Sequence, residues 1–480
     1  MRPILRVLGA VLTSAAMLTG TAVADADVSW NAPGIDWSPC PDAPAADCGT
    51  VRVPLDWAEP HGPSVDLAVS RLKASDPARR IGVLFGDPGG PGGSAAAFAQ
   101  SGSYFSAEVR ARFDVIGFDQ RGTGGSSVIR CSPEVLAKAP SPYPADQAAF
   151  DALLRYNAEL RTDCRAQGGP LFDHANTADA ARDMDFVRRA LRERRISFAG
   201  ISYGTLLGEQ YAELFGEHLR AMVLDSVIDH SADTTRFVVD RAASVEASFG
   251  EFVKWCDRDA ACVLHGRDVV ALWEDALRGA DASGFGRENL LGYVHGLLYE
   301  PAWGEIASVI EALAAPPGVR EWFEPNYGSI RQATVCQDFS LRIKGFGEYR
   351  RLYAEETRVA PLMRGSRLGH DEAVACAGTP GKAANPPHRW DVRRGPKVLL
   401  VSSRFDPATP YSWAESLHRQ APGKTALLTY DGWGHVAYPR SECTRGGVDG
   451  YLIGLEVPGE GVRCAGVEGA ALVGFGPLAG

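Results

Sequence analysis

The sequence predicts an α/β protein whose mostly parallel central sheet is flanked by helices and interrupted by a mainly helical insertion. Short β-branched runs that end in turn residues recur along the chain, at residues 81–85, 115–118, 196–199, 222–224, 398–401 and 426–430. Helical patterns lie between several of these runs, as at residues 178–191 and 206–215. Buried strands that alternate with helices indicate a parallel sheet covered on both faces.

Two segments depart from this alternation. Residues 51–55 and 65–72 alternate apolar and polar side chains on either side of a turn rich in proline and glycine, which predicts a β-hairpin. Residues 231–393 show the spacing of amphipathic helices and no series of strands. We therefore expect two core segments, at 25–230 and 394–480, separated by a helical lid.

The first 24 residues have the pattern of an export signal. Arg2 and Arg6 precede a short apolar stretch, and Ala-Val-Ala at 22–24 is the small-x-small pattern that a signal peptidase needs. The stretch is shorter than the roughly 20 residues that span a bilayer, which disfavours a membrane anchor. We therefore predict that residues 1–24 are a removed signal peptide and that the protein is secreted and extracellular.

Composition restricts the partners of the protein. The formal net charge of −10 disfavours binding to nucleic acid or to an anionic membrane. The chain contains no C-x-x-C or H-E-x-x-H metal motif and no cofactor motif, so we expect neither a metal nor a cofactor. The sequence is compatible with a monomer.

The ten cysteines form an even set, as in exported proteins with disulfide bonds. Sequence alone leaves their connectivity open. Pairing between neighbours along the chain predicts Cys40 with Cys48, Cys131 with Cys164, Cys256 with Cys262, Cys336 with Cys376, and Cys443 with Cys464.

One motif, Gly-x-Ser-x-Gly at residues 200–204, predicts a serine nucleophile at Ser202. In a chain with 53 glycines the motif alone is a weak signal, and an ordinary turn serine is the alternative. The motif, however, follows a predicted strand and precedes a predicted helix. In that setting the serine adopts a strained backbone conformation with its Oγ exposed. The amide of Tyr203, at the start of the helix, then faces the charge that develops on the substrate oxygen.

A serine hydroxyl needs a neighbouring base to attack near neutral pH. Asp406 and His435 follow the last two predicted strands, in the chain order Ser, Asp, His that this arrangement requires. Both therefore lie at the same edge of the sheet as Ser202. We predict that His435 accepts the Ser202 proton and that Asp406 orients its imidazole. Asp225, which ends an earlier strand, is the competing acid.

A second oxyanion donor is expected in the glycine-rich loop at residues 86–93, which follows the first buried strand. Glycines let backbone amides approach a substrate without a Cβ in the way. A phosphate-binding loop is the alternative, but the run lacks the Lys-Ser/Thr ending of a P-loop. We predict that the Gly90 amide acts together with that of Tyr203.

Together these residues resemble the secreted tripeptidyl aminopeptidases, which are relatives of the prolyl iminopeptidases in the α/β-hydrolase superfamily. The resemblance covers nearly the whole mature chain, and its motifs are residues 53–57, 88–94, 113–122 and 200–205 and the loops of Asp406 and His435. Two positions depart from the pattern. Asp87 stands where an Asn is expected and Ala95 where a glycine is common, which alters the hydrogen bonding expected in the glycine loop.

The resemblance implies an α/β-hydrolase fold and a serine exopeptidase that releases short peptides, typically three residues, from a free N-terminus. The buried ammonium of such a substrate must be paired with a carboxylate of the lid. Asp338 and Glu246 are the candidates, against the alternative that each is a solvated helix acid. A carboxylesterase or lipid hydrolase with the same triad is the alternative activity, and a non-catalytic binding protein of the same fold is a third possibility.

Overall fold

The computed structural model describes residues 32–312 and 327–468, so the expected signal peptide lies outside the described residues. Within them, ten strands form one sheet in the order β1-β2-β3-β5-β4-β6-β7-β8-β9-β10. Pairings from β1 through β3 to β5 are antiparallel, and all others are parallel. The strands are β1 (Ser38–Pro39), β2 (Asp47–Pro54), β3 (Ser64–Leu72), β4 (Gly82–Asp87), β5 (Phe113–Phe118), β6 (Ile196–Ile201), β7 (Leu219–Asp225), β8 (Val398–Phe405), β9 (Thr425–Trp433) and β10 (Arg463–Ala465).

The sheet confirms the α/β architecture predicted from the sequence. The predicted hairpin is β2 and β3, and the six buried runs are the cores of β4 to β9. The edge strands β1 and β10 were not predicted. They contain only two and three residues, which is too short for a recognisable alternation of apolar and polar side chains.

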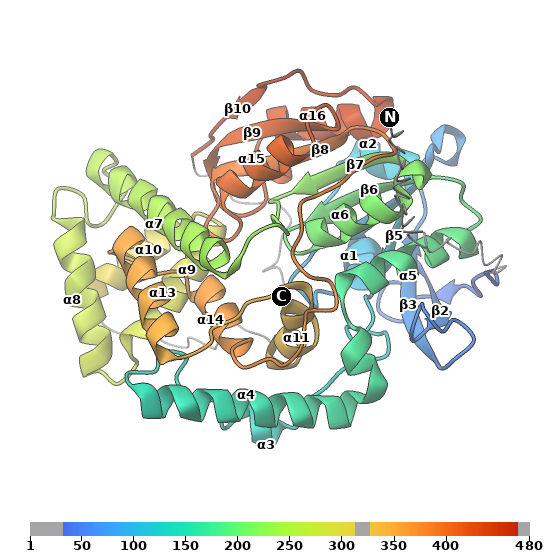
Figure 1. Ribbon diagram of the computed structural model, residues 1–480. Coiled ribbons are helices and arrows are strands. Elements are labelled where there is room, and N and C mark those ends of the chain that lie inside the picture. Colours follow the sequence, from blue (N-terminus) through green and yellow to red (C-terminus); the bar gives the residue numbers. More distant parts are fainter. Residues whose placement is uncertain (1–31, 313–326, 469–480) are drawn as a thin grey trace, which may run out of the picture.

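Helices cover both faces of the sheet (Figure 1). Successive residues of a strand face opposite sides, so that Val83 and Phe85 enter one apolar core and Leu84 the other. α5, α6 and α15 contribute to the first core, and α1, α2 and α16 to the second. The core helices are α1 (Ala95–Ser101), α2 (Ala107–Arg112), α3 (Pro133–Leu136), α4 (Gln147–Gly168), α5 (Thr177–Ala190), α6 (Gly204–Phe215), α15 (Tyr411–Gln420) and α16 (Glu442–Gly454).

The chain leaves the sheet after β7 and returns at β8, and the described residues in between contain no strand. This segment, the lid, has its own apolar core around Phe249 and Trp273. A second cluster joins the lid at Phe237 and Phe339 to the core at Tyr203. The lid helices are α7 (Thr234–Arg258), α8 (Val269–Ala282), α9 (Arg287–Tyr299), α10 (Trp303–Ala312), α11 (Tyr327–Ile330), the π-helix η4 (Arg331–Val335), α12 (Cys336–Asp338), α13 (Phe346–Val359) and α14 (Arg367–Ala375).

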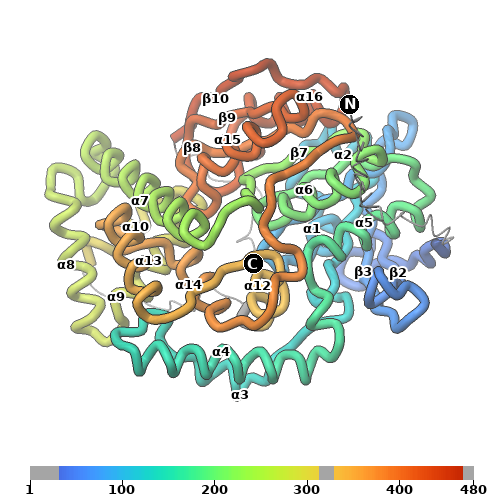
Figure 2. Tube along the Cα trace, in the orientation of Figure 1, coloured from blue at the N-terminus to red at the C-terminus, as the bar shows by residue number. Residues whose placement is uncertain are grey.

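The core also reaches under the lid. Figure 2 shows the long helix α4 running past α12 and α14. The side-chain amide of Asn157 in α4 donates to the carbonyl oxygens of Val374 and Ala377, at 2.9 and 3.1 Å. Lid and core are therefore joined by polar contacts as well as by apolar packing.

The five disulfides are the five pairs predicted from neighbouring positions in the sequence. Cys336–Cys376 joins α12 to the end of α14 within the lid. In the part of the chain that the structure covers, every cysteine is paired. The same part contains no helix with the length and apolar character that a membrane span requires.

Candidate active site

Ser202 occupies the tight turn between β6 and α6. Its φ of 55° lies in the left-handed region that residues other than glycine rarely adopt. Glycine is required two residues before it, because a Cβ on Gly200 would lie 2.5 Å from the carbonyl oxygen of Gly204. The Ser202 amide donates to the carbonyl oxygen of Asp225, at the end of β7, over 3.0 Å. The turn thus has the geometry of a nucleophile elbow.

Asp406 and His435 are brought together from the ends of β8 and β9. The Nδ1 atom of His435 lies 3.0 Å from both carboxylate oxygens of Asp406, and both side chains are buried. Burial alone would raise the pKa of Asp406, but the neighbouring His435 and the amides of Thr409 and Ala408 hold this pKa below its ordinary value. An ionised carboxylate in this position can orient the imidazole and stabilise the imidazolium.

Asp225, the competing acid, binds the backbone of the histidine loop and not its imidazole. Its carboxylate accepts the amides of Ala437 and Tyr438, at 2.9 and 2.8 Å, and the hydroxyl of Tyr104 at 3.2 Å. These amides belong to the loop that begins with His435. Asp225 therefore holds the backbone of the histidine loop, whereas Asp406 holds the imidazole ring.

Ser226, the residue after β7, links the acid to the same loop. Its hydroxyl donates to Oδ2 of Asp406 over 2.7 Å and accepts the amide of Val436 over 2.8 Å. Sequence reasoning missed Ser226, because a single serine after a strand carries no signal of its partners.

The glycine loop packs directly against the elbow. A Cβ on Gly89 would lie 2.4 Å from the carbonyl oxygen of Ile201 and 2.7 Å from the amide nitrogen of Tyr203. Gly89 and Gly90 have φ values of 88° and 115°, which only glycine adopts readily. The close contact at Gly89 therefore places the glycine loop beside the Tyr203 amide, and Gly90 remains the predicted second oxyanion donor.

Asp87 lies buried at the base of this loop. Its Oδ1 accepts the Gly89 amide at 2.8 Å, and its Oδ2 accepts the side-chain amide of Gln120 at 2.9 Å. Burial raises the pKa of Asp87 to about 6, although both hydrogen bonds lower it. Asp87 thus supplies the acceptor that an Asn would supply, together with an ionisable group.

Asp338 is not placed to bind a substrate. Its Oδ1 accepts the Thr177 amide at 2.9 Å and the Asn385 side-chain amide at 3.0 Å. Its Oδ2 accepts the hydroxyls of Thr177 and Tyr203, at 2.5 and 2.9 Å. The carboxylate is fully buried and has four internal donors, which contradicts the expectation that it pairs with a substrate ammonium.

Glu246 is used within the lid in a similar way. Its carboxylate accepts the backbone amides of Leu362 and Met363, at 3.1 and 2.9 Å. It stabilises the turn after α13, which contradicts the expectation of an ammonium-binding role. In both cases the sequence showed an acid in the lid but not the backbone amides and hydroxyls that it meets.

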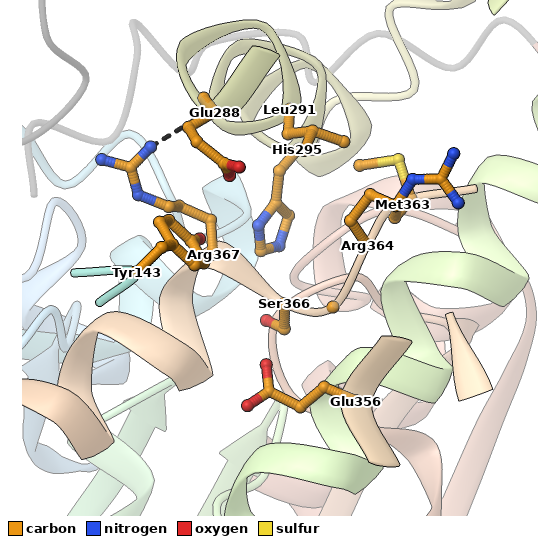
Figure 3. A pocket seen from close by; sticks show the side chains of 10 residues that line it. Tyr143, Glu288, Leu291, His295, Glu356, Met363, Arg364, Ser366 and Arg367 are labelled. Carbon is orange, nitrogen blue, oxygen red and sulfur yellow. Dashed lines mark hydrogen bonds between the residues drawn. The ribbon is translucent and has the colours of Figure 1, made fainter. Parts of the chain in front are cut away.

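A small pocket in the lid contains other acids (Figure 3). The side chains of Glu288 and Glu356 approach it from opposite sides, with His295 between them. Glu356 is paired with His370, whose Nδ1 lies 3.1 Å away. Burial raises the pKa of Glu288 even though Arg367 lies nearby. The sequence could not single out Glu288, because a helix acid that faces a pocket has the same local pattern as one that faces solvent.

Helix α9 connects this pocket to the histidine. The Nε2 atom of His295 lies 3.0 Å from the carbonyl oxygen of Pro407, the residue after Asp406. The ring of Tyr299, at the end of the helix, lies 5.0 Å from the ring of His435. The pocket and the Asp406–His435 pair therefore lie along one helix.

Ser226→Ala is expected to lower the free energy of unfolding by about 1–3 kcal/mol, because the buried Val436 amide loses its acceptor. Ser402→Ala is the matched control, since the buried hydroxyl of Ser402 has no hydrogen-bond partner among the described residues. Its removal should be nearly neutral. Urea unfolding measures both variants, and equal losses would contradict the linking role of Ser226.

Asp87→Asn tests the raised pKa of Asp87. Because this pKa is about 6 in the folded protein against an ordinary 3.8, the folded state binds the proton more tightly than the unfolded chain. This stabilising term is present below about pH 4 and is lost as the pH rises through 6. Asn keeps an acceptor for Gly89 without the ionisation. Calorimetry measures the Tm of both proteins, and we expect the difference, variant minus wild type, to be larger at pH 8 than at pH 4. A difference that does not change with pH would contradict the raised pKa of Asp87.

Comparison with known proteins gives the family of this chain. Residues 88–300 match the family described as alpha/beta hydrolase fold, and residues 361–464 match the family described as TAP-like protein. The tripeptidyl aminopeptidase of Streptomyces coelicolor is 31% identical over 476 residues, which cover 90% of this chain and 86% of that protein. Serine protease Hip1 of Mycobacterium tuberculosis is 29% identical, with 90% and 91% covered. Carboxylesterase B of the same organism is 30% identical, with 90% of each chain covered. The chain is thus a serine hydrolase and belongs to the tripeptidyl aminopeptidase family of α/β hydrolases.

Proposed function

We propose that the protein is a secreted serine exopeptidase that releases short peptides, typically of three residues as in its family, from free N-termini. The observation that carries the proposal is the joint placement of the Ser202 elbow and the Asp406–His435 pair at the carboxyl ends of β6, β8 and β9. Relatives named as a tripeptidyl aminopeptidase and a serine protease support a peptide substrate. A relative named carboxylesterase B supports the alternative of an ester.

In the proposed reaction, Oγ of Ser202 attacks the scissile carbonyl carbon while His435 accepts its proton. The amides of Tyr203 and Gly90 stabilise the negative charge on the carbonyl oxygen. His435 then donates the proton to the leaving amine, the C–N bond breaks, and the released N-terminal part remains as an ester on Ser202. A water molecule, deprotonated by His435, hydrolyses this ester. Asp406 stabilises the imidazolium in both halves of the reaction.

Export is supported by two features of the chain. Its five disulfides are typical of proteins that fold in an oxidising compartment. Its first 24 residues have the composition of a signal peptide. We therefore propose an extracellular protein that acts on peptides, without nucleic acid or membrane as a partner.

The lid pocket supports recognition of a free N-terminus. Residues rise about 1.5 Å each along a helix, so His295 and Glu288 lie roughly 6 and 16 Å along α9 from Tyr299, which contacts His435. Three extended residues span about 10 Å. The ammonium of an acylating tripeptide would therefore fall between the levels of His295 and Glu288 along α9, both of which line the pocket. We propose that the carboxylate of Glu288 pairs with it.

Ser202→Ala is expected to lower turnover by about 10³-fold or more and to abolish labelling by a fluorophosphonate probe. Mass spectrometry of the products from one peptide, with its N-terminus free or acetylated, then reads the position of the cut. The proposal expects a tripeptide from the free form alone. Turnover of nitrophenyl esters without turnover of tripeptide nitroanilides would establish the esterase alternative. A wild-type protein that the probe does not label would be a non-catalytic binding protein.

Glu288→Gln is expected to raise KM for free tripeptide nitroanilides by about tenfold or more, the effect of losing a hydrogen bond between charged groups. Turnover of an N-acetylated ester should not change. Glu305→Gln is the control, because Glu305 lies in α10 and contacts the hydroxyl of Tyr293 away from the pocket. A similar rise of KM in both variants would count against an ammonium site at Glu288.

A further inference from the structure

The lid holds the side chain of Tyr203, the residue that follows the nucleophile. The Tyr203 hydroxyl donates to Oδ2 of Asp338 over 2.9 Å, and both side chains are buried. Asp338 is the last residue of α12, in the lid. We propose that Asp338 is a positioning residue, which fixes Tyr203 and with it the amide that stabilises the oxyanion. This inference rests on the proposed acyl-transfer function.

The elbow needs such an anchor. Ser202 is held in a left-handed conformation, and rotation about its N–Cα bond to a negative φ would relieve the strain while turning the following Tyr203 amide away from the oxyanion. Tyr203 is also the N-cap residue of α6, where its side chain makes no capping hydrogen bond. The cost of such backbone strain is of the same order as one hydrogen bond to a charged group. A single bond from Asp338 to the far end of the Tyr203 side chain is therefore strong enough to oppose the rotation.

Asp338 is itself fixed from several sides. Its other hydrogen bonds come from Thr177, the first residue of α5, and from Asn385, in the segment that returns to β8. Its carbonyl oxygen lies 2.7 Å from Nε2 of His230. Because Asp338 is held by Thr177 of α5 and by Asn385, it cannot move together with Tyr203 if the backbone of the elbow relaxes.

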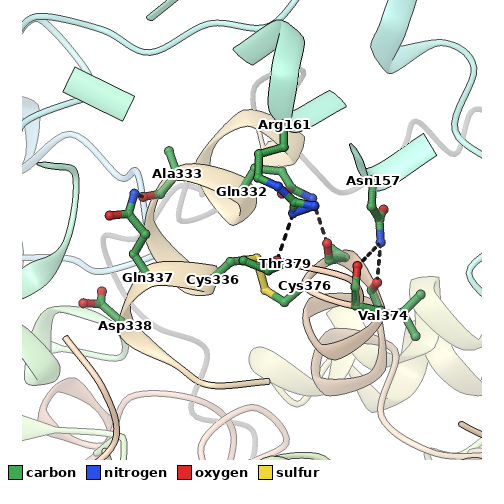
Figure 4. Close-up of a disulfide and its surroundings, with 12 residues drawn as sticks. Asn157, Arg161, Gln332, Ala333, Cys336, Gln337, Asp338, Val374, Cys376 and Thr379 are labelled. Atoms are coloured by element: carbon green, nitrogen blue, oxygen red, sulfur yellow. Dashed lines mark hydrogen bonds between the residues drawn. A yellow bond between two sulfur atoms is a disulfide. The ribbon is translucent and has the colours of Figure 1, made fainter. Parts of the chain in front are cut away.

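The lid disulfide supports the same anchor (Figure 4). Cys336 begins α12, and its bond to Cys376 joins this short helix to the end of α14. Figure 4 shows the Asp338 carboxylate on the side of α12 that faces away from the disulfide. The disulfide thus fixes α12 on one side, and the hydrogen bonds of Asp338 fix it on the other.

Two substitutions separate positioning from general stabilisation. Tyr203→Phe and Thr177→Val each remove one hydroxyl from the same oxygen, Oδ2 of Asp338. The Tm of both variants should fall by a similar number of degrees. Only Tyr203→Phe should lower kcat, by about tenfold, which is less than the 10²–10³-fold loss on deleting an oxyanion donor. KM should stay within about twofold, because the ground-state contacts of the substrate remain.

The substrate comparison distinguishes this role from ammonium binding. Asp338→Asn should lower kcat to a similar extent on a free tripeptide nitroanilide and on an N-acetylated nitrophenyl ester. The double variant Asp338→Asn/Tyr203→Phe should lose no more kcat than Asp338→Asn alone, because both substitutions act on the same hydrogen bond. A rise of KM confined to the free peptide would overturn positioning in favour of ammonium binding.

The outcome that overturns the inference differs from the one that overturns the function. If the kcat of Tyr203→Phe equals that of Thr177→Val while the fluorophosphonate probe still labels Ser202, Asp338 is a structural residue only. If the wild-type protein is not labelled, the acyl-transfer function itself fails. Circular dichroism of each variant confirms that it is folded before its kcat is compared.

Discussion

Two consecutive residues at the carboxyl end of β7 hold together the loops that carry the site. The Asp225 carbonyl oxygen receives the Ser202 amide, and its carboxylate receives two amides of the histidine loop. The Ser226 hydroxyl then bridges Asp406 and the amide of Val436. A parallel sheet brings the ends of its strands to one edge, but these loops are long enough to move. The polar junction after β7 is what fixes their mutual positions.

The lid contributes to the same framework. The Tyr299 carbonyl oxygen accepts the His435 amide at 3.0 Å, and the Ser244 hydroxyl donates to the carbonyl oxygen of Asp406 at 2.5 Å. Tyr203, beside the nucleophile, is bound by Asp338. His435, Asp406 and Tyr203 thus each have a hydrogen bond to a residue of the lid. The lid is accordingly part of the scaffold that orders the site, in addition to carrying the pocket of Glu288.

Much of the fold could be predicted because its signals are local. The strands β2 to β9 have six to nine residues, long enough for a recognisable apolar pattern, whereas β1 and β10 are too short to show one. Cysteine neighbours in sequence proved to be partners in space. The lid acids were assigned wrongly for a physical reason. The donors that bind Asp338 include Thr177, which lies 161 residues away, and no local pattern reports such a contact.

The sequence by itself determined the elbow, because its constraints are all within a few residues. Glycine must flank Ser202 where β6 meets α6, and the turn leaves the serine at positive φ. It also determined the order of Asp406 and His435 after adjacent strands. Only the tertiary structure decided which acids serve the scaffold and which line the lid pocket. Asp225, Asp338 and Glu246 are carboxylates like Glu288, and a carboxylate takes its role from the donors that distant parts of the chain bring to it.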